Sequence, residues 1–411
     1  MIFTALYAIG MKLFRAGIAL ASPFDEKARL MHRGLAGVTG RLANYDNSQR
    51  CVWIHAASLG EFEQGRPIIE AVKAQYPDKR VVLTFFSPSG YEIRKNYNLA
   101  DLVTYLPLDG PMASERFVST INPEVAIFVK YEFWHFYLRA LARRRIPTYN
   151  ISTIFRPQQM FFRPAGGWFR KMLGQFTHLY VQDEQSARLL EGIGLKNYTV
   201  AGDTRFDRVA KIAAQSAENA TAKAFAEGAR VIVAGSTWAP DEDLLTEYIN
   251  TAPDDMKLIL APHEIDEAHI RQIVRKLKVS YSLITEAMAD VNSKKVLIIN
   301  TMGMLSGIYK YGEIAYIGGG FGKGIHNTLE AATYGMPVVF GTNYKRFKEA
   351  CDLIECGAGF NINNYTELKN VLDNLWSDIP KLAEAKKSAG KYVESMCGAT
   401  DKIMHDLFAA G

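Results

Sequence analysis

Short apolar runs alternate with helix-length segments along almost the whole chain, which predicts parallel β-sheets covered by helices on both faces. A first series of strands is predicted at residues 52–55, 80–85, 102–105, 125–129, 148–151 and 179–181. A second series is predicted at residues 231–234, 257–260, 296–299, 314–317, 337–340 and 359–362. Two such series predict an α/β protein with two doubly wound, Rossmann-like domains.

The boundary between the two domains is predicted near residues 202–210, where a long helix follows a polar turn. We therefore assign residues 25–204 to a first domain and residues 205–411 to a second, preceded by a separate segment, 1–24. A chain of 411 residues is long enough for two cores. Because ligands of doubly wound sheets bind beyond the carboxyl ends of the strands, we expect the site in a cleft between the domains.

Residues 1–24 are predicted to form an amphipathic helix that lies on a membrane surface. Lys12 and Arg15 share a narrow stripe, whereas apolar side chains occupy the other side and Pro23 ends the helix. The two charges argue against a spanning helix, and in a signal peptide they would precede the apolar run. A helix packed on the protein itself is the alternative.

The charge is distributed unevenly along the chain. Residues 1–200 contain 25 Lys and Arg against 16 Asp and Glu, a net charge of +9, so the remaining residues contain 23 against 27, or −4. A basic first half favours an anionic partner, either a membrane surface or an acidic substrate, although a solvated basic face would look the same. No nucleic-acid partner is expected, because no recognised nucleic-acid-binding motif is present. The four cysteines lack metal-ligand spacing and fit a reducing compartment.

The stretch from Tyr316 to Gly341 predicts a nucleotide-sugar site. It reads as a buried strand that ends in glycines, a helix from about His326, and a second buried strand. Glycines allow a close approach of the backbone to a ligand, and a helix N-terminus attracts phosphate. Glu330 would share a helical face with His326 and accept bonds from ribose hydroxyls. A purely structural turn is the alternative.

Other polar residues follow predicted strands of the second domain. Ser236 and Thr237 could bond phosphate oxygens, and His263 could contact a base or a ribose. Arg205 could offer a guanidinium fork to a carboxylate or phosphate, or pair with a neighbouring aspartate. Residues 241–243 spell D-x-D, but they follow a proline as acidic residues do in the first turn of a helix, so no metal site is expected.

In the first domain, Glu61 follows a strand-to-helix turn and is a candidate general base. The alternative is a carboxylate that only complements the helix dipole. Lys130 and Glu132 flank the end of another strand, and Arg156 follows the next one. These residues indicate either a basic surface that binds an acceptor substrate or a surface that is only solvated.

Taken together, the motifs resemble those of the 3-deoxy-D-manno-octulosonic acid (Kdo) transferases of lipopolysaccharide synthesis, in the same order up to about residue 350. The matching segments are Ser58-Leu59-Gly60-Glu61 with S-V-G-E, Glu132 and Trp134 with E-x-E-L-W-P, Gly235-Ser236-Thr237 with G-S-T-H, and Gly318–Phe321, His326-Asn327 and Glu330 with G-G-x-F…G-H-N-x-L-E. The chain departs from the family at Lys130 in place of a glutamate, His135 in place of a proline, and Trp238 in place of a histidine. The arginine that usually precedes the position of His263 is also missing.

This resemblance implies a glycosyltransferase of the GT-B type, inverting and without cofactor or metal, at the cytoplasmic face of the bacterial inner membrane. Its donor would be CMP-Kdo and its acceptor a lipid A precursor. The implied catalytic residue is Glu61, and the implied acceptor-binding residues are Ser58, Gly60, Lys130, Glu132 and Arg156. The implied donor-binding residues are Arg205, Ser236, Thr237, His263, Gly319, Gly320, Phe321, His326, Asn327 and Glu330. A nucleotide-sugar epimerase of the same architecture and a non-catalytic membrane scaffold are the alternatives.

Overall fold

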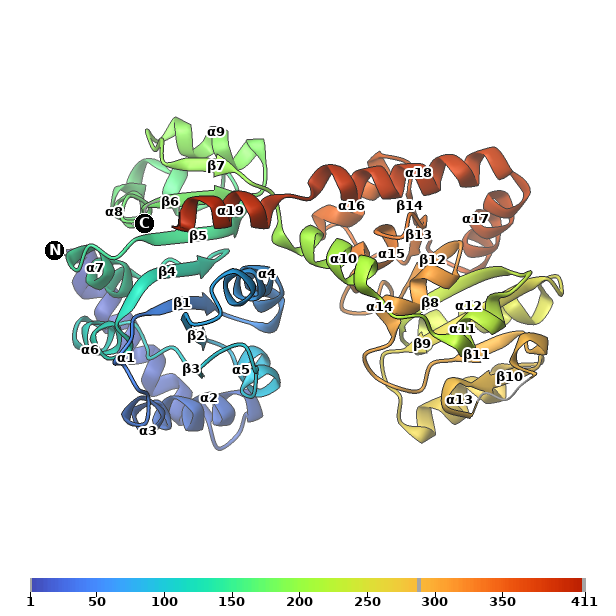
Figure 1. Cartoon of the computed structure of the whole chain (residues 1–411), viewed down its shortest axis with the longest axis horizontal. Helices are drawn as coiled ribbons and strands as arrows, with labels where there is room; N and C mark the ends of the chain where they lie inside the picture. Colours follow the sequence, from blue (N-terminus) through green and yellow to red (C-terminus); the bar gives the residue numbers. More distant parts are fainter. Residues whose placement is uncertain (1, 287–289, 409–411) are drawn as a thin grey trace. The chain divides into compact units, whose positions relative to one another are not determined.

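A computed structural model of the protein describes residues 2–286 and 290–408. The chain forms two compact units, Met1–Asp207 together with Cys397–Gly411, and Arg208–Met396 (Figure 1). In the described residues each unit contains one seven-stranded sheet in which all pairs are parallel. The prediction of two doubly wound α/β domains is confirmed.

The strand order is that of a doubly wound sheet in both units. The first sheet runs β3 (Leu102–Tyr105), β2 (Arg80–Phe85), β1 (Cys51–Ala56), β4 (Pro123–Val129), β5 (Thr148–Thr153), β6 (His178–Val181), β7 (Tyr198–Val200). The second runs β10 (Tyr281–Leu283), β11 (Val296–Ile298), β9 (Met256–Pro262), β8 (Arg230–Thr237), β12 (Ile314–Ile317), β13 (Val338–Phe340), β14 (Gly359–Asn361).

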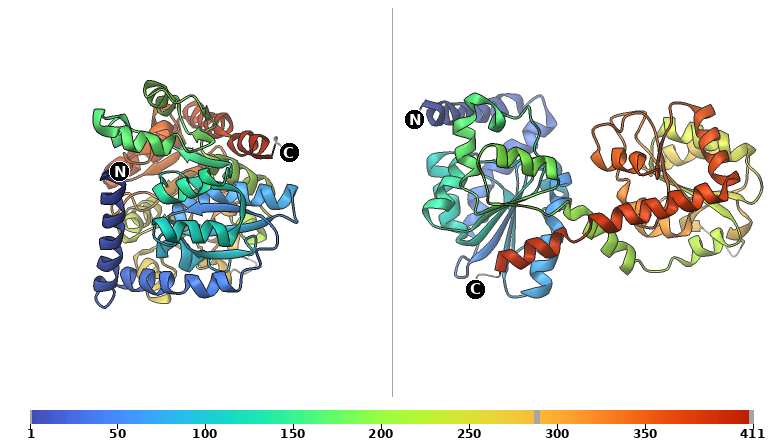
Figure 2. Two further views of the ribbon diagram at one scale, coloured as in Figure 1. Left: turned by 90° about the vertical axis from the view of Figure 1, so that its left-hand side faces the viewer. Right: turned by 90° about the horizontal axis from the view of Figure 1, so that it is seen from above.

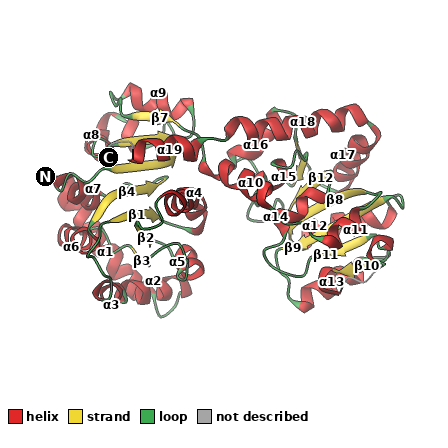
Figure 3. Cartoon of the chain, in the orientation of Figure 1, coloured by secondary structure: helices red, strands yellow, loops and turns green. Residues whose placement is uncertain are grey.

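Helices cover both faces of each sheet (Figure 3). Those of the first unit are α1 (Ile2–Ala21), α2 (Glu26–Ala36), α3 (Val38–Ala43), α4 (Leu59–Gln75), α5 (Pro88–Arg94), α6 (Pro111–Ile121), α7 (His135–Arg143), α8 (Gly167–Leu173), α9 (Glu184–Gly192) and α19 (Ala399–Phe408). α10 (Thr204–Gln215) begins in the first unit and continues into the second. The second unit adds α11 (Ala220–Ala226), α12 (Ala239–Thr251), α13 (Glu267–Lys276), α14 (Leu305–Ile308), α15 (Leu329–Ala332), α16 (Lys348–Glu355), α17 (Tyr365–Ser377) and α18 (Ile379–Met396).

The residues of β1 show why continuous apolar runs become strands here. Cys51 and Trp53 belong to one buried cluster, whereas Val52, Ile54 and Ala56 belong to another. Successive side chains of a strand point to opposite faces, so the two clusters fill the two faces of the sheet. A strand covered on both faces gains from apolar residues at every position, which is the pattern that the sequence displays.

The edge strands β7 and β10 were not predicted. Each has three residues, partly or fully exposed, and each lies at the end of its sheet. An edge strand faces a neighbour on one side only, so it needs no continuous apolar run to form. Without that run, the sequence pattern cannot distinguish such a strand from a loop.

The C-terminal residues belong to the first unit, whereas the sequence analysis assigned all of 205–411 to the second. Asp207 accepts hydrogen bonds from the backbone N–H groups of Gly398 and Thr400, at 2.5 and 2.7 Å. Tyr180 in β6 donates to Asp406 in α19 across 2.8 Å. These contacts join segments about 200 residues apart, which a reading of local patterns does not detect.

α1 lies along the outside of the first unit and packs on it with one face (Figure 2). Tyr7 donates to the buried Asp109 across 2.8 Å, Thr4 accepts from Trp168 across 3.3 Å, and Ile18 is buried. Seven large apolar side chains of α1 are exposed: Ile2, Phe3, Leu6, Ile9, Leu13, Phe14 and Leu20. α1 is also long and apolar enough to cross a membrane, judged by length and composition alone. One face therefore packs on the protein, and the other is available to an apolar environment.

Candidate functional site

The predicted catalytic and acceptor-binding residues gather at one edge of the first sheet. β4 lies between β1 and β5, so the carboxyl ends of these three strands are neighbours. Glu61 follows β1, Lys130 and Glu132 follow β4, and Arg156 follows β5. Ligands of doubly wound sheets bind at this edge.

Glu61 lies in the first turn of α4, which has Ser58 as its N-cap and passes through Gly60. The Glu61 carboxylate accepts a hydrogen bond from the backbone N–H of Ala57 across 2.6 Å, so it does complement the helix start. Burial and the charge of Glu132 nevertheless raise the pKa of Glu61 to about 8, against the opposing effects of the Ala57 N–H and of Lys130. A carboxyl with a pKa close to neutral pH is suited to accept a proton during a reaction.

Glu132 is held in one orientation by Trp134 and by the buried His55. Its Oε2 accepts from Trp134 Nε1 across 2.6 Å and lies 2.9 Å from His55 Nε2. His55 is fully buried, and its Nδ1 lies 2.9 Å from Thr84 Oγ1. The sequence analysis did not single out His55, although a histidine inside the buried run of β1 is an unusual signal.

Lys130 adopts a left-handed backbone conformation, with φ of 64°. Its carbonyl accepts from Asn150 Nδ2 and from Thr153 Oγ1, each across 3.2 Å. Non-glycine residues in this region are uncommon and occur preferentially at functional sites. Burial raises the pKa of the next residue, Tyr131, with a smaller contribution from the charge of Glu61 and an opposing one from Arg156. The charges of Glu61 and Arg156 therefore both act on Tyr131, a residue that was not predicted from the sequence.

The raised pKa of Glu61 predicts a pH-dependent effect on stability. In the unfolded chain the carboxyl has its ordinary pKa of roughly 4.3. The folded protein therefore retains a proton that the unfolded chain releases between about pH 4.3 and 8, and stability falls as the pH rises through this window. Glu61→Gln, which can still accept from Ala57, should raise the thermal unfolding midpoint at pH 9 but leave it nearly unchanged at pH 4. An equal difference at both pH values would contradict the raised pKa.

The predicted donor-binding residues of the second unit gather at the corresponding edge of the second sheet. Ser236 and Thr237 end β8, His263 follows β9, and the glycine-rich turn follows β12. β8 lies between β9 and β12, which makes these strand ends neighbours. Ser236 has a left-handed φ of 53°, and Thr237 is buried and donates to Glu242 across 3.2 Å.

The glycine-rich turn packs against other parts of the chain. A Cβ atom on Gly318 would lie 2.3 Å from the Ser236 carbonyl oxygen, and one on Gly320 would lie 2.5 Å from the Cα of Gly341. The N–H of Gly319 donates to Asp241 across 2.9 Å. Close packing within the protein therefore explains why glycine occupies positions 318 and 320. Asp241 of the D-x-D sequence stabilises the turn through its bond to Gly319. Phe321 packs at the edge of the core of the second unit.

The helix predicted from about His326 is much shorter than expected. α15 contains only Leu329–Ala332, so His326 precedes it and does not share a helical face with Glu330. Asn327 Oδ1 accepts from the N–H of Leu329 across 3.1 Å, and its Nδ2 donates to Glu330 across 3.0 Å. The helix cannot continue because Gly335 is left-handed, with φ of 69°, and Pro337 follows.

Arg205 belongs to the first unit, whereas the other predicted donor-binding residues belong to the second. Its Nε and Nη2 donate to Asp203 across 3.0 and 2.8 Å. Burial opposes ionisation of Asp203, but the Arg205 charge prevails and lowers the pKa of that carboxyl. The pairing with an aspartate, one of the two roles considered from the sequence, is therefore present.

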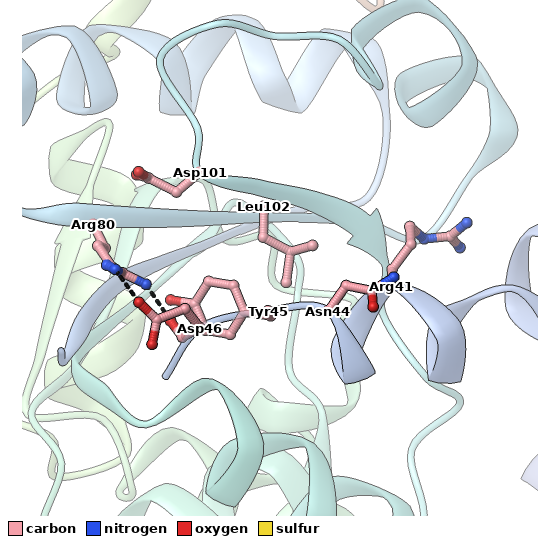
Figure 4. A pocket seen from close by; sticks show the side chains of 7 residues that line it. All are labelled: Arg41, Asn44, Tyr45, Asp46, Arg80, Asp101 and Leu102. Atoms are coloured by element: carbon pink, nitrogen blue, oxygen red, sulfur yellow. Dashed lines mark hydrogen bonds and ion pairs between the residues drawn. The ribbon is translucent and has the colours of Figure 1, made fainter. Parts of the chain in front are cut away.

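A separate pocket of about 470 Å³ lies at the opposite edge of the first sheet (Figure 4). Its lining includes Arg80 and Leu102, the first residues of β2 and β3. Arg80 donates to Asp46 within this pocket. Since the candidate residues follow the carboxyl ends of the strands, this pocket is not part of the candidate site.

Solved structures of other proteins share this fold. The UDP-GlcNAc 2-epimerase of Neisseria meningitidis superposes with a TM-score of 0.59 at 14% identity, covering 88% of this chain and all of that one. MurG of Acinetobacter baumannii superposes with a TM-score of 0.56 at 11% identity, covering 88% of this chain and all of that one. Two parallel sheets with such neighbours define the GT-B fold.

Within this fold class, the chain is similar to the Kdo transferases. Residues 34–208 match the family model described as 3-deoxy-D-manno-octulosonic-acid transferase. The 3-deoxy-D-manno-octulosonic acid transferase of Aquifex aeolicus is 26% identical over 85% of this chain and 94% of its own length. That of Bordetella pertussis is 26% identical over 87% of this chain and 86% of its own length. The resemblance inferred from the motifs is confirmed, and it favours a transferase over an epimerase or a scaffold.

Proposed function

We propose that the protein transfers Kdo from CMP-Kdo to a lipid A precursor, with inversion at the anomeric carbon and without a metal ion. The observation that carries the proposal is Glu61, a partly buried carboxyl with a pKa of about 8 at the carboxyl edge of the first sheet. Similarity to the Kdo transferases supplies the sugar that is transferred.

In the proposed reaction, a hydroxyl oxygen of the acceptor bonds to the anomeric carbon of Kdo. The bond from that carbon to the phosphate oxygen of CMP breaks, and its electron pair leaves with CMP. The hydroxyl proton moves to the Glu61 carboxylate. Lys130, Arg156, Ser58 and Gly60 would hold the acceptor, and Glu132 would keep the pKa of Glu61 high.

The second unit would bind the donor. Ser236 would approach the phosphate, the buried Thr237 would hold the end of β8 through Glu242, and His263 would approach the base or the ribose. His326 and Asn327 would line the same edge, with Gly319, Gly320 and Phe321 forming its floor. Arg205 would assist from the first unit. No step requires a metal ion, because charged and N–H groups would stabilise the departing phosphate.

Glu330 is proposed to bind the ribose hydroxyls of the donor. A hydrogen bond to a charged group is worth roughly 1.5–3 kcal/mol, so Glu330→Gln should weaken CMP binding by about 10- to 100-fold in isothermal titration calorimetry. The variant keeps an oxygen that can accept from Asn327. The matched control is Glu313→Gln, whose carboxylate pairs with Lys386 in the same unit. Equal affinities of the two variants would contradict the assignment.

We further propose that the exposed face of α1 contacts the cytoplasmic surface of the inner membrane, which contains the lipid acceptor. The exposed apolar residues of α1 and the net charge of +9 over residues 1–200 support this proposal. α1 is also connected to the candidate site by aromatic contacts. Phe14 stacks on Phe86 at 5.9 Å between ring centroids, and Phe86 packs on Trp134 at 5.0 Å.

A further inference from the structure

Three aromatic rings of the second unit form a stack at the carboxyl ends of β8, β9 and β12. The His263 ring centroid lies 4.5 Å from that of Trp238 and 4.7 Å from that of His326, with interplanar angles of 25° and 28°. Trp238 Nε1 donates to His326 Nε2 across 3.0 Å. The stack and the hydrogen bond together fix the orientation of the His326 ring.

The chemistry of the two side chains determines where the proton of His326 resides. An indole N–H can only donate, so Nε2 of His326 must present a lone pair. The hydrogen bond made by one ring nitrogen determines which of the two carries the proton. A neutral His326 ring in this contact therefore carries its hydrogen on Nδ1.

We propose that Trp238 is a positioning residue that holds His326 as the neutral Nδ1–H tautomer, which leaves this N–H to donate to the phosphate of the bound nucleotide. The role of the Nδ1–H group as a phosphate donor rests on the proposed function. The assignment of the His326 tautomer does not depend on it. Burial and the charge of His263 also lower the pKa of His326, which favours the neutral ring. Protonation would place a hydrogen on Nε2 and abolish the bond from Trp238.

Trp238 is also one of the positions at which the chain departs from the Kdo transferase motif, where the resemblance places a histidine. A histidine at this position could donate to or accept from His326, so it would not select one tautomer. The tryptophan indole can only donate, so it selects a single tautomer of His326. The departure thus has a specific chemical consequence at the candidate donor site.

The test is NMR of the full chain labelled with ¹⁵N-histidine, in which two-bond ¹H–¹⁵N couplings distinguish the tautomers. His326→Gln identifies the His326 signals. We expect Nδ1 protonated and Nε2 unprotonated at pH 7. Trp238→Phe keeps an aromatic ring for the stack but removes the N–H, and should release His326 to an Nε2–H or mixed state. Trp238→His, a second and independent replacement, should also give a mixture.

Trp376→Phe is the matched control, because the buried Trp376 Nε1 has no hydrogen-bond partner among the described residues. It should leave the His326 signals unchanged. An Nε2–H or doubly protonated His326 in the unmodified chain would overturn the proposal, as would an unchanged Nδ1–H in Trp238→Phe.

Calorimetric titration with CMP tests the functional consequence separately. Trp238→Phe should bind CMP about tenfold more weakly than the unmodified chain and Trp376→Phe. Equal binding would overturn the phosphate role of His326 while leaving its tautomer intact. If the unmodified chain does not bind CMP, the proposed function fails, and the NMR result still decides whether Trp238 sets the tautomer.

Discussion

Replacing Glu61 with glutamine should lower kcat for Kdo transfer by roughly 10²- to 10⁴-fold, the contribution typical of a positioned general base. Glutamine has nearly the same shape and can still accept from the N–H of Ala57, so the helix start should be preserved. Without a carboxylate, however, the side chain cannot take the proton of the acceptor hydroxyl. Initial rates with saturating donor and acceptor measure the effect.

Glu63→Gln is the matched control for this experiment. Glu63 lies two residues further along α4, and its carboxylate pairs with Arg94 at 3.0 Å. Its replacement should leave kcat within about twofold, since its carboxylate pairs with Arg94 and takes no part in the proposed proton transfer. CMP affinity should be nearly equal in both variants. If Glu61→Gln retained more than a tenth of the activity, Glu61 would not be the base.

The same assignment predicts the pH dependence of the unmodified enzyme. The base must be ionised, and the pKa of Glu61 is about 8. The value of kcat/KM should therefore rise with pH up to about 8 and level off above it. An enzyme whose base had the ordinary pKa of glutamate would show no rise between pH 6 and 9.

Placing charges on the exposed face of α1 should produce the second large effect. Leu6 and Leu13 are 58% and 68% exposed on this face. Burial of one leucine is worth roughly 1.5–3 kcal/mol, so the double variant Leu6→Glu/Leu13→Glu should weaken partitioning onto anionic vesicles by about 100-fold or more. Co-sedimentation with vesicles of phosphatidylglycerol and phosphatidylethanolamine measures the partition coefficient.

The control for the membrane experiment is Met302→Glu/Ile379→Glu. Both of these side chains are more than 70% exposed, and both lie in the second unit. This variant carries the same added charge but should partition like the unmodified chain. If the two double variants partitioned equally, the face of α1 would not be the membrane contact.

The buried strands were predictable from the sequence because they are covered on both faces and therefore consist of continuous apolar runs. β7 and β10 were missed because short edge strands lack this signature. The return of α19 to the first unit depends on contacts such as Tyr180–Asp406, which local periodicity does not contain.

The positions of the candidate residues at the strand ends were predictable where residue type and strand ends coincide, as at Glu61, Lys130 and Ser236. The role of a residue was less predictable where its contacts are made with other parts of the protein. The glycines after β12 appeared suited to a ligand, but the space of the missing Cβ atoms is filled by neighbouring chain segments. His55 and Tyr131 were missed because they interact with residues that only the fold brings close to them.

The central claim is the transfer of Kdo to a lipid, and its most direct test is to incubate the purified protein with CMP-Kdo and a lipid A precursor, with and without EDTA. Mass spectrometry of the lipid then reports the product. The account predicts that the lipid gains one or more Kdo units and that the chelator does not change the yield. A lipid of unchanged mass beside an intact donor would contradict the claim, as would conversion of the donor without any acceptor.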